Sequence, residues 1–391
     1  MTVPGRLHSV ASIRQDLMFP THLESAVKLW HLAIAFAAAA AASCTSKTAR
    51  SGSDTTGGGT RTASGGSALT GAGATFPFPI YDRWFHEYAA KTGIKINYQP
   101  IGSGGGIKQL SEQTVDFGAS DAPMTDAEMA GAKGGPIMHF PTVVGVVAVA
   151  YNLAGLAQPI RLSGAAVADI FAGRITKWND SRLVALNPGV TLPNADILVV
   201  HRSEASGTTY VFSDYLSAVS PRWKASPGRG KELSWPTGLG AKGNDGVTAQ
   251  IKQTPGAVGY VELAYVKQNG LATALIQNSA GQFVAPAASA ATAAAEGAVA
   301  KLPANTDYRV SIVNSPGAQT YPIASFTWLL LYRNEPDTVK ARELVDFVRW
   351  AYTDGQKDAE SLDYAPLPKS LVSRLTARLD SIVPRRPAAA R

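Results

Sequence analysis

Residues 141–151 read PTVVGVVAVAY, and this valine-rich run predicts a strand that is buried on both faces. Two further apolar runs, ILVV at 197–200 and FTWLLLY at 326–332, predict buried strands elsewhere in the chain. Shorter strands are predicted at 94–98 and 114–118.

Amphipathic helices separate these strands. Their apolar residues recur at helical spacing, as in Ile80, Trp84 and Tyr88, in Val167, Ile170 and Phe171, and in Leu344, Val345, Phe347 and Val348. Strands that alternate with helices are typical of the α/β class. The alanine-rich stretch 285–301 predicts a surface helix without a chemical role.

The composition allows two or three domains with a sizeable core, because 45% of the 391 residues are hydrophobic and 17% are charged. Cys44 is the only cysteine, which excludes an internal disulfide framework and a cysteine-rich zinc module. Three of the six histidines lie in the first 43 residues, so a histidine-rich metal site is not expected. We expect neither a metal nor another cofactor.

The net charge of +7 lies entirely in the terminal extensions, residues 1–67 and 371–391. Residues 68–370 carry equal numbers of acidic and basic side chains. A nucleic-acid-binding face needs clustered Lys and Arg on a folded surface. We therefore expect no nucleic-acid partner.

The N-terminal segment, residues 1–43, has the pattern of an export signal. Lys28 precedes the apolar run LWHLAIAFAAAAAA at 29–42, which is shorter than the roughly 20 residues of a membrane span. The sequence AASC at 41–44 is similar to a lipoprotein cleavage site, which would make Cys44 the lipidated first residue. A plain signal peptide with an incidental cysteine is the alternative. The Gly/Ser-rich residues 44–67 predict a flexible linker with a reach of about 25 Å.

Three glycine-containing loops lead from a predicted strand into a predicted helix. They are LTGAGATFPFP at 69–79, IGSGGGIK at 101–108 and HRSEASGTTY at 201–210. In the first, Thr75 is the expected N-cap. The start of a helix presents free N–H groups to an anion, although a plain capped helix start explains the same pattern.

The third loop is the most informative, because Arg202 precedes the Ser206-Gly207-Thr208 helix start. An arginine, hydroxyl groups and a helix N-terminus together suit a tetrahedral oxyanion. A surface ion pair between Arg202 and Glu204 is the alternative reading of the arginine.

Two other motifs carry less weight. The GLGAKG at 238–243 follows Trp235-Pro236 where a dinucleotide-binding motif needs a strand. The GASDA at 118–122 is similar to a hydrolase nucleophile elbow, but no histidine stands in a motif that would supply its base.

The chain resembles the phosphate-binding protein, the substrate-binding component, of the bacterial high-affinity phosphate ABC transporter. The resemblance runs in order from about Leu69 to Leu371. The strings that carry it are LTGAGATFPFPIY, IGSGGGIKQ, VDFGASDAPM, HFPTVVGVVAVAYN, DIFAGRITKWND, SGTTYVFSDYL, WPTGLGAKGNDGV, PGAVGYVELAYVKQN and LDYAPLP.

The resemblance implies a two-lobed periplasmic-binding-protein fold of type II, with two α/β domains joined by crossing hinge strands and the ligand in the cleft. Lobe 1 would comprise residues 68–146 and 320–391, with a basic tail from about 371, and lobe 2 residues 147–319. The crossings would be at 143–151 and 326–332.

The resemblance also implies a set of phosphate ligands on the three loops and on the GASDAP motif. They are Ala74, Thr75, Phe76, Ser103, Asp121, Arg202, Ser206, Gly207 and Thr208. Glu204 would orient Arg202, and Asp121 would accept a hydrogen bond from a protonated phosphate oxygen. The chain departs from the family pattern at Gly104, at His201 and at Glu204-Ala205.

The function implied is that of a monomeric receptor, not an enzyme, at the periplasm or cell surface. It would bind inorganic phosphate and deliver it to the transmembrane subunits of an ABC permease and their ATPase. A receptor for another oxyanion, a secreted phosphatase and an adhesive lipoprotein are the alternatives. Sulfate carries no proton near neutral pH, so a carboxylate at position 121 disfavours it.

Overall fold

The computed structural model describes residues 68–303 and 306–382. The predicted signal segment 1–43, with Cys44, and the linker 44–67 lie outside these residues. Within the described part of the chain, no helix is long and apolar enough to cross a membrane.

The described residues alternate between strands and helices over most of their length. The strands are β1 (Leu69–Gly73), β2 (Ile96–Gln99), β3 (Phe117–Ser120), β4 (Ile137–Tyr151), β5 (Arg161–Leu162), β6 (Leu198–Arg202), β7 (Leu239–Ala241), β8 (Ala257–Glu262), β9 (Ala272–Thr273), β10 (Leu275–Gln277), β11 (Phe283–Val284) and β12 (Ala324–Tyr332). The α-helices are α1 (Phe78–Thr92), α2 (Ser103–Ser111), α3 (Asp126–Ala130), α4 (Gly164–Phe171), α5 (Ser181–Leu186), α6 (Gly207–Val219), α7 (Pro221–Ala225), α8 (Gly243–Gln253), α9 (Leu263–Asn269), α10 (Ala288–Val299), α11 (Thr338–Thr353) and α12 (Lys369–Leu379). Two short 3-10 helices, Gly355–Asp358 and Glu360–Leu362, follow α11.

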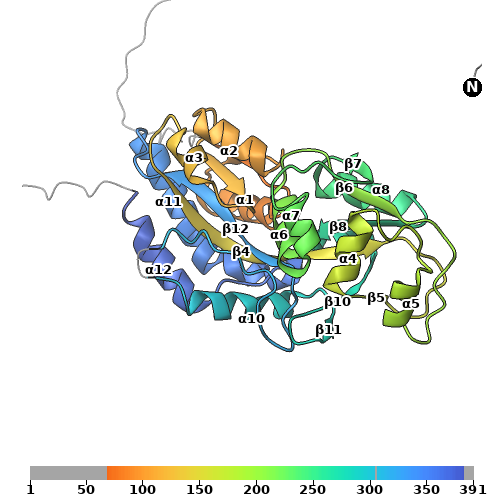
Figure 1. Ribbon diagram of the computed structural model, residues 1–391. Coiled ribbons are helices and arrows are strands. Elements are labelled where there is room, and N and C mark those ends of the chain that lie inside the picture. Colours follow the sequence, from red (N-terminus) through yellow and green to blue (C-terminus); the bar gives the residue numbers. More distant parts are fainter. Residues whose placement is uncertain (1–67, 304–305, 383–391) are drawn as a thin grey trace, which may run out of the picture. The chain divides into compact units, whose positions relative to one another are not determined.

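One continuous sheet runs through the fold in the strand order β2-β1-β3-β12-β4-β8-β6-β7. We call the part with β1, β2, β3, β12 and the start of β4 the first half, and the part with the end of β4, β6, β7 and β8 the second half. Strand β4 belongs to both halves: residues 137–146 pair with β12, and residues 147–151 pair with β8 (Figure 1). All fifteen residues of β4 are buried, which explains why its sequence is a continuous apolar run. The predicted crossing at 143–151 therefore coincides with the change of partner strand.

Strand β12 lies wholly beside the first part of β4. Its residues 324–332 pair with β4 residues 137–146, so the expectation that 326–332 crosses between the halves is wrong. The chain returns to the first half just before β12, where the Ile323 carbonyl accepts a 2.8 Å hydrogen bond from the Val147 N–H. Strand β12 runs antiparallel to both neighbours, β3 and β4.

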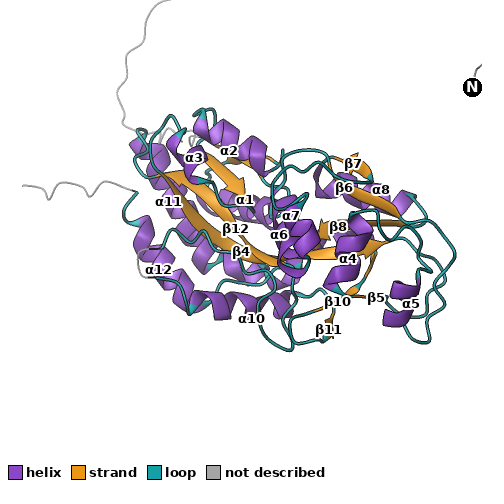
Figure 2. Cartoon of the chain, in the orientation of Figure 1, coloured by secondary structure: helices purple, strands orange, loops and turns teal. Residues whose placement is uncertain are grey.

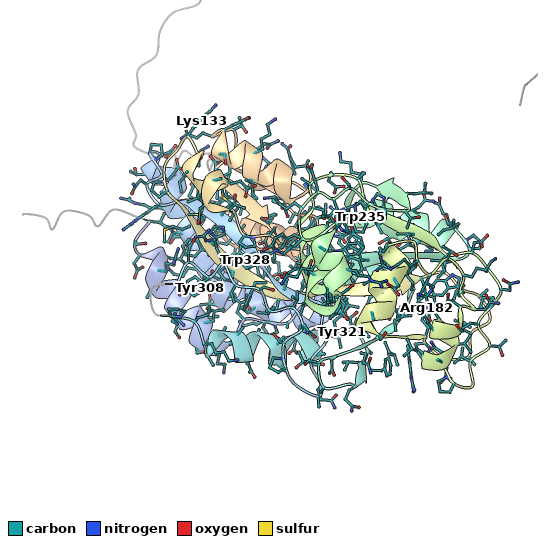
Figure 3. All side chains as sticks on the ribbon, viewed as in Figure 1. Lys133, Arg182, Trp235, Tyr308, Tyr321 and Trp328 are labelled. Carbon is teal, nitrogen blue, oxygen red and sulfur yellow. The ribbon has the colours of Figure 1, made fainter. Side chains whose placement is uncertain are left out.

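The helices pack around the strands (Figure 2). Each half has its own aromatic cluster. The cluster of the first half contains Tyr81, Phe85, Tyr98, Phe117 and Phe347. That of the second half contains Phe171, Phe212, Trp235 and Tyr260. Trp328 and Trp235, labelled in Figure 3, lie in the first and second halves respectively. The two aromatic clusters thus belong to one continuous hydrophobic core on a common sheet.

The alanine-rich helix α10 is part of the core and not only a surface helix. Ala290, Ala291, Ala294 and Ala295 are buried, and α10 packs against β4 and β12. Small side chains let the helix lie close to these strands. The sequence pattern did not reveal this, because the stretch has almost no large apolar side chains that would mark which side is buried.

Candidate functional site

The first loop runs from the end of β1 into α1 and contains Ala74, Thr75 and Phe76, all buried. The expectation that Thr75 caps α1 is wrong, because the N-cap position is Pro77 and has no side-chain hydrogen bond. The Thr75 hydroxyl instead accepts hydrogen bonds from Asn244, at 2.9 Å from Nδ2 and 3.3 Å from the main-chain N–H. Gly145 of β4 lets the Phe76 ring pack closely, since a Cβ there would lie 2.2 Å from it.

Three tyrosine hydroxyls hold the carbonyl groups of this loop. Tyr98 donates to the carbonyl of Ala74 at 2.8 Å and Tyr265 to that of Thr75 at 2.7 Å. Tyr364 donates to the carbonyl of Phe76 at 2.6 Å. Three consecutive carbonyls are thus fixed from three different parts of the chain. The N–H groups of Thr75 and Phe76, which belong to the first two of these peptides, are consequently held in one orientation, whereas the third peptide ends at Pro77 and has no N–H.

The second loop places Ser103 as the first residue of α2, fully buried. Its Oγ accepts a 3.2 Å hydrogen bond from the Asp121 N–H. Gly102 has a φ of 96°, which only glycine adopts readily, and its N–H donates to the Gly73 carbonyl at 2.8 Å. The second loop is therefore joined directly to the first.

Asp121 follows β3 and is buried, with 1% of its surface exposed. Burial raises the pKa of Asp121 to about 7, although a hydrogen bond from Thr327, the charge of Arg202 and a hydrogen bond with Ser103 act in the opposite direction. Asp121 therefore changes protonation state near neutral pH.

In the third loop, Arg202 ends β6 and its guanidinium group is held by two side chains. Nε donates to Glu204 Oε1 at 2.9 Å, Nη2 also contacts that oxygen, and Nη1 donates to Thr208 Oγ1 at 3.1 Å. Glu204 Oε1 accepts a further bond from the Gly243 N–H at 3.1 Å. The Arg202 side chain is 1% exposed and that of Glu204 is 19% exposed, so the cation is buried and its carboxylate is partly buried.

Ser206 is the N-cap of α6, and its Oγ accepts a 3.1 Å hydrogen bond from the Thr209 N–H. Gly207 follows at a point where a side chain cannot fit. A Cβ there would lie 2.4 Å from Ser103 Oγ and 2.5 Å from Asp121 Oδ2. The first turn of α6 therefore touches the second loop and Asp121, which belong to the other half of the fold.

The structure brings together all of the residues that the sequence nominated. The N–H of Gly104 donates to the Ala205 carbonyl at 2.9 Å, Asn244 joins Thr75 to Thr208, and Gly207 abuts Ser103 and Asp121. The side chains of Thr75, Ser103, Asp121, Arg202, Ser206 and Thr208 are each at most 4% exposed. We call this set, with Ala74, Phe76 and Gly207, the cleft cluster.

Sequence reasoning missed Asn244, Thr327 and the three tyrosines that hold the first loop. Asn244 stands at a fourth strand–glycine–helix junction, between β7 and α8, which has the same pattern as the other three loops. The sequence GLGAKG at this junction resembles a dinucleotide-binding motif and does not by itself point to Asn244. Thr327 and the tyrosines reach the cluster over long distances in sequence, so no local pattern marks them.

The cleft cluster is chemically a set of hydrogen-bond donors around one arginine and one titratable carboxyl. The hydroxyls of Thr75, Ser103, Ser206 and Thr208 can each donate to a ligand oxygen. Among the described residues no group of three or more His, Cys, Asp or Glu side chains is placed to hold a metal ion. The arrangement suits a small anion that also carries a proton.

The family model described as the PBP superfamily domain matches residues 45–354. The phosphate-binding protein PstS of Haemophilus influenzae is 44% identical over 323 residues, which cover 82% of this chain and 95% of the relative. The chain belongs to the PstS family of that superfamily. The corresponding protein of Xylella fastidiosa strain 9a5c is 43% identical over 311 residues, or 79% of this chain and 84% of the relative.

Solved structures agree on the fold. A high-affinity periplasmic phosphate-binding protein, PfluDING, bound with phosphate, superposes with a TM-score of 0.64 at 20% identity and covers 82% of this chain and all of its own. A phosphate-binding protein from Stenotrophomonas maltophilia gives 0.63 at 22% identity over 80% of this chain and 94% of its own. The predicted two-lobed periplasmic-binding-protein fold is confirmed.

Proposed function

We propose that this protein is an extracytoplasmic receptor that binds inorganic phosphate in the cleft cluster and delivers it to an ABC-type permease. The observation that carries the proposal is the convergence of three helix-start loops: Gly207 abuts Ser103 and Asp121, and Asn244 joins Thr75 to Thr208. Arg202 donates to Thr208, and burial raises the pKa of Asp121 to about 7. Relatives that cover most of the chain bear the name phosphate-binding protein PstS, which agrees with this function.

The donors of the cleft cluster can replace the water shell of a phosphate ion. A hydrogen bond to a charged group contributes about 1.5–3 kcal/mol, so several hydroxyl and main-chain donors offset the cost of removing the ion from water. Arg202 supplies the positive charge, and Glu204 keeps its guanidinium fork in place through Nε. Neutral donors in the remaining positions avoid the cost of burying further unpaired charges.

Asp121 distinguishes phosphate from fully ionised oxyanions. Phosphate near neutral pH carries a proton that can be donated to a carboxylate oxygen, whereas sulfate would meet that oxygen with a lone pair. Oδ1 of Asp121 already accepts from Thr327 at 2.8 Å, so Oδ2, which lies next to Gly207, is the oxygen available to the ligand.

Binding would be accompanied by closure of two lobes, residues 68–146 with 320–391 against residues 147–319. This division is supported by the change of partner along β4 between Val146 and Val147. Ligand contacts from Thr75 and Asp121 on one side and Arg202 and Thr208 on the other supply the free energy that favours the closed form.

The cellular setting follows from the N-terminal segment and the family. We propose that the signal segment 1–43 is removed and that Cys44 carries a lipid anchor. Residues 44–67 then form the flexible linker between this anchor and the folded part. The receptor acts as a monomer at the periplasm or cell surface and has no catalytic role. Its partners are the transmembrane subunits of the permease and their ATPase.

Calorimetric titration of residues 45–391 tests the proposal, after bound phosphate has been removed by unfolding and refolding in phosphate-free buffer. Phosphate should bind and sulfate should bind far more weakly under identical conditions. Arg202→Ala should weaken the binding of both anions. The substitution removes a positive charge that attracts either anion, whether or not the anion carries a proton. Absence of phosphate binding, or equal affinity for sulfate, would overturn the proposal.

A further inference from the structure

Asn244 lies at the centre of the cleft cluster, fully buried in the first turn of α8. Its Oδ1 accepts a 3.0 Å hydrogen bond from the main-chain N–H of Glu262. That main-chain group can only donate, so the amide oxygen must face it and the Nδ2 group must face the opposite way. The orientation of the Asn244 amide is thus set by the backbone of β8.

The two hydrogens of Asn244 Nδ2 go to two hydroxyls from different halves of the fold. Nδ2 lies 2.9 Å from Thr75 Oγ1 and 3.3 Å from Thr208 Oγ1. Both donor hydrogens of the side chain are then in use, so Asn244 has no donor left for an anionic ligand.

Each of the two hydroxyls accepts two hydrogen bonds. Thr208 Oγ1 accepts from Asn244 Nδ2 and, at 3.1 Å, from Arg202 Nη1. Thr75 Oγ1 accepts from Asn244 Nδ2 and, at 3.3 Å, from the Asn244 main-chain N–H. A hydroxyl has two lone pairs and one hydrogen, so both lone pairs are occupied and only the hydrogen remains.

We propose that Asn244 is a positioning residue that fixes Thr75 and Thr208 as hydrogen-bond donors toward the ligand. The inference rests on the proposed function, and it divides the cleft cluster into two chemical sides. The side at Thr75 and Thr208 demands ligand oxygens with free lone pairs. The side at Asp121 accepts a ligand hydrogen. An anion with both kinds of oxygen, such as monohydrogen phosphate, satisfies the two sides together.

The decisive variant is Asn244→Asp, because it replaces the Nδ2 donor by an acceptor of the same shape. The hydroxyls of Thr75 and Thr208 would then turn toward the new carboxylate and no longer donate to the ligand. Phosphate should bind about 100-fold more weakly, since two charge-assisted hydrogen bonds are lost. Asn244→Ala only frees the hydroxyls to rotate, and it should weaken binding by about five- to tenfold.

Gln250→Glu is the matched control, because it adds the same charge to the same helix. Gln250 donates to Thr254 and touches no member of the cleft cluster. This variant should bind phosphate within about twofold of the parent protein, because the half-buried residue 250 does not contact the cleft cluster and salt screens its charge. Affinity for phosphate is measured by calorimetry, and thermal unfolding checks that each variant is folded.

A double-mutant cycle keeps the test decisive if Asn244→Asp does not fold. In the Thr208→Val background the loss caused by Asn244→Ala should be at least about threefold smaller than in the parent, since Asn244 acts through that hydroxyl. Additive losses, or an Asn244→Asp variant that binds as well as Asn244→Ala, overturn the inference. If the parent protein does not bind phosphate, the proposed function itself fails, which is a different result.

Discussion

The hydroxyl of Thr327 donates a 2.8 Å hydrogen bond to Oδ1 of Asp121, and both residues are buried. Thr327 lies on β12 near the end of the chain, and Asp121 follows β3 near its beginning. The bond occupies one carboxyl oxygen and holds the plane of the carboxyl group. Asp121 therefore meets a ligand with a single oxygen, Oδ2.

Asp121→Asn should change the selectivity between phosphate and sulfate. The substitution keeps the shape but allows an NH₂ donor to replace the acceptor that repels sulfate. Sulfate binding should improve by roughly five- to two-hundred-fold, which corresponds to about 1–3 kcal/mol for removing one unfavourable buried polar contact. Titration of parent and variant with both anions at one pH measures the ratio. An unchanged ratio would show that Asp121 does not discriminate.

The same carboxyl should make the stability of the phosphate-free protein depend on pH. The pKa of Asp121 is about 7 in the folded protein against 3.8 as the ordinary value, so the folded state binds the proton more tightly. Its contribution to the free energy of unfolding is fully present below pH 4 and is lost as the pH rises through 7. The total loss is on the order of a few kcal/mol.

Urea unfolding of the parent protein and of Asp121→Asn between pH 4 and pH 8 measures this effect. The difference between the two curves isolates Asp121 from other buried acids such as Glu262, whose pKa burial also raises. The parent should lose stability relative to the variant as the pH rises. Parallel curves would contradict the prediction.

Tyr265→Phe should weaken phosphate binding by about tenfold, because it frees the Thr75 carbonyl that the Tyr265 hydroxyl holds at 2.7 Å. Tyr321→Phe is the control, since Tyr321 is also buried and donates to a carbonyl, that of Val147, away from the cleft cluster. Both variants should lose about 1–2 kcal/mol of stability. Equal phosphate affinities in the two variants would count against a role for the tyrosine in the site.

The ion pair between Lys231 and Glu128 should slow the release of phosphate. The pair joins α3, in the first half, to the loop that contains Lys231, in the second half. The main-chain carbonyl of Lys231 also accepts a 2.9 Å hydrogen bond from the N–H of Ser206, a member of the cleft cluster. Lys231→Met should speed dissociation by about three- to tenfold, because one contact between the halves is lost. Stopped-flow measurement of phosphate release checks this.

Lys177→Met is the matched control for that experiment. Lys177 pairs with Asp196, and both residues belong to the second half, so the pair does not span the cleft. Its loss should leave the release rate of phosphate unchanged. A similar acceleration in both variants would mean that the Lys231–Glu128 pair has no specific effect on closure.

Cys44→Ser should release the protein from membranes if Cys44 carries the proposed lipid anchor. Residue 44 precedes the described part of the chain, so this prediction stands on the AASC sequence and the following linker. Membrane fractionation and mass spectrometry of the mature N-terminus measure it. An unmodified Cys44, or a mature chain that starts elsewhere, would contradict the prediction.

Local sequence patterns were sufficient for the elements and for the loops of the site. The apolar run 141–151 lies within β4, and the Ser206-Gly207 helix start is the N-terminus of α6. Local patterns did not predict the role of a residue where that role depends on contacts with residues far away in the sequence. Thr75 has the residue type of an N-cap, but its hydroxyl accepts a hydrogen bond from Asn244. Helix α1 starts at Phe78 instead, with Pro77 at the cap and Pro79 in its first turn.

The burial of α10 and the position of β12 have the same cause. An alanine-rich stretch and an apolar run show which residues can be buried, but their partners are set by the order of strands in the sheet. The resemblance to the phosphate-binding family implied a crossing at residues 326–332. The register with residues 137–144 places them beside β3 and β4.

The position of β12 between β3 and β4 has a consequence for biosynthesis. A chain that emerges from its N-terminus delivers β1 to β4 early, and the place between β3 and β4 stays vacant until residues 324–332 have followed. The first half of the sheet cannot be completed from a partial chain, because β12, which lies between β3 and β4, comes late in the sequence. Such a connectivity delays stable folding of the first half of the sheet until residues 324–332 have emerged.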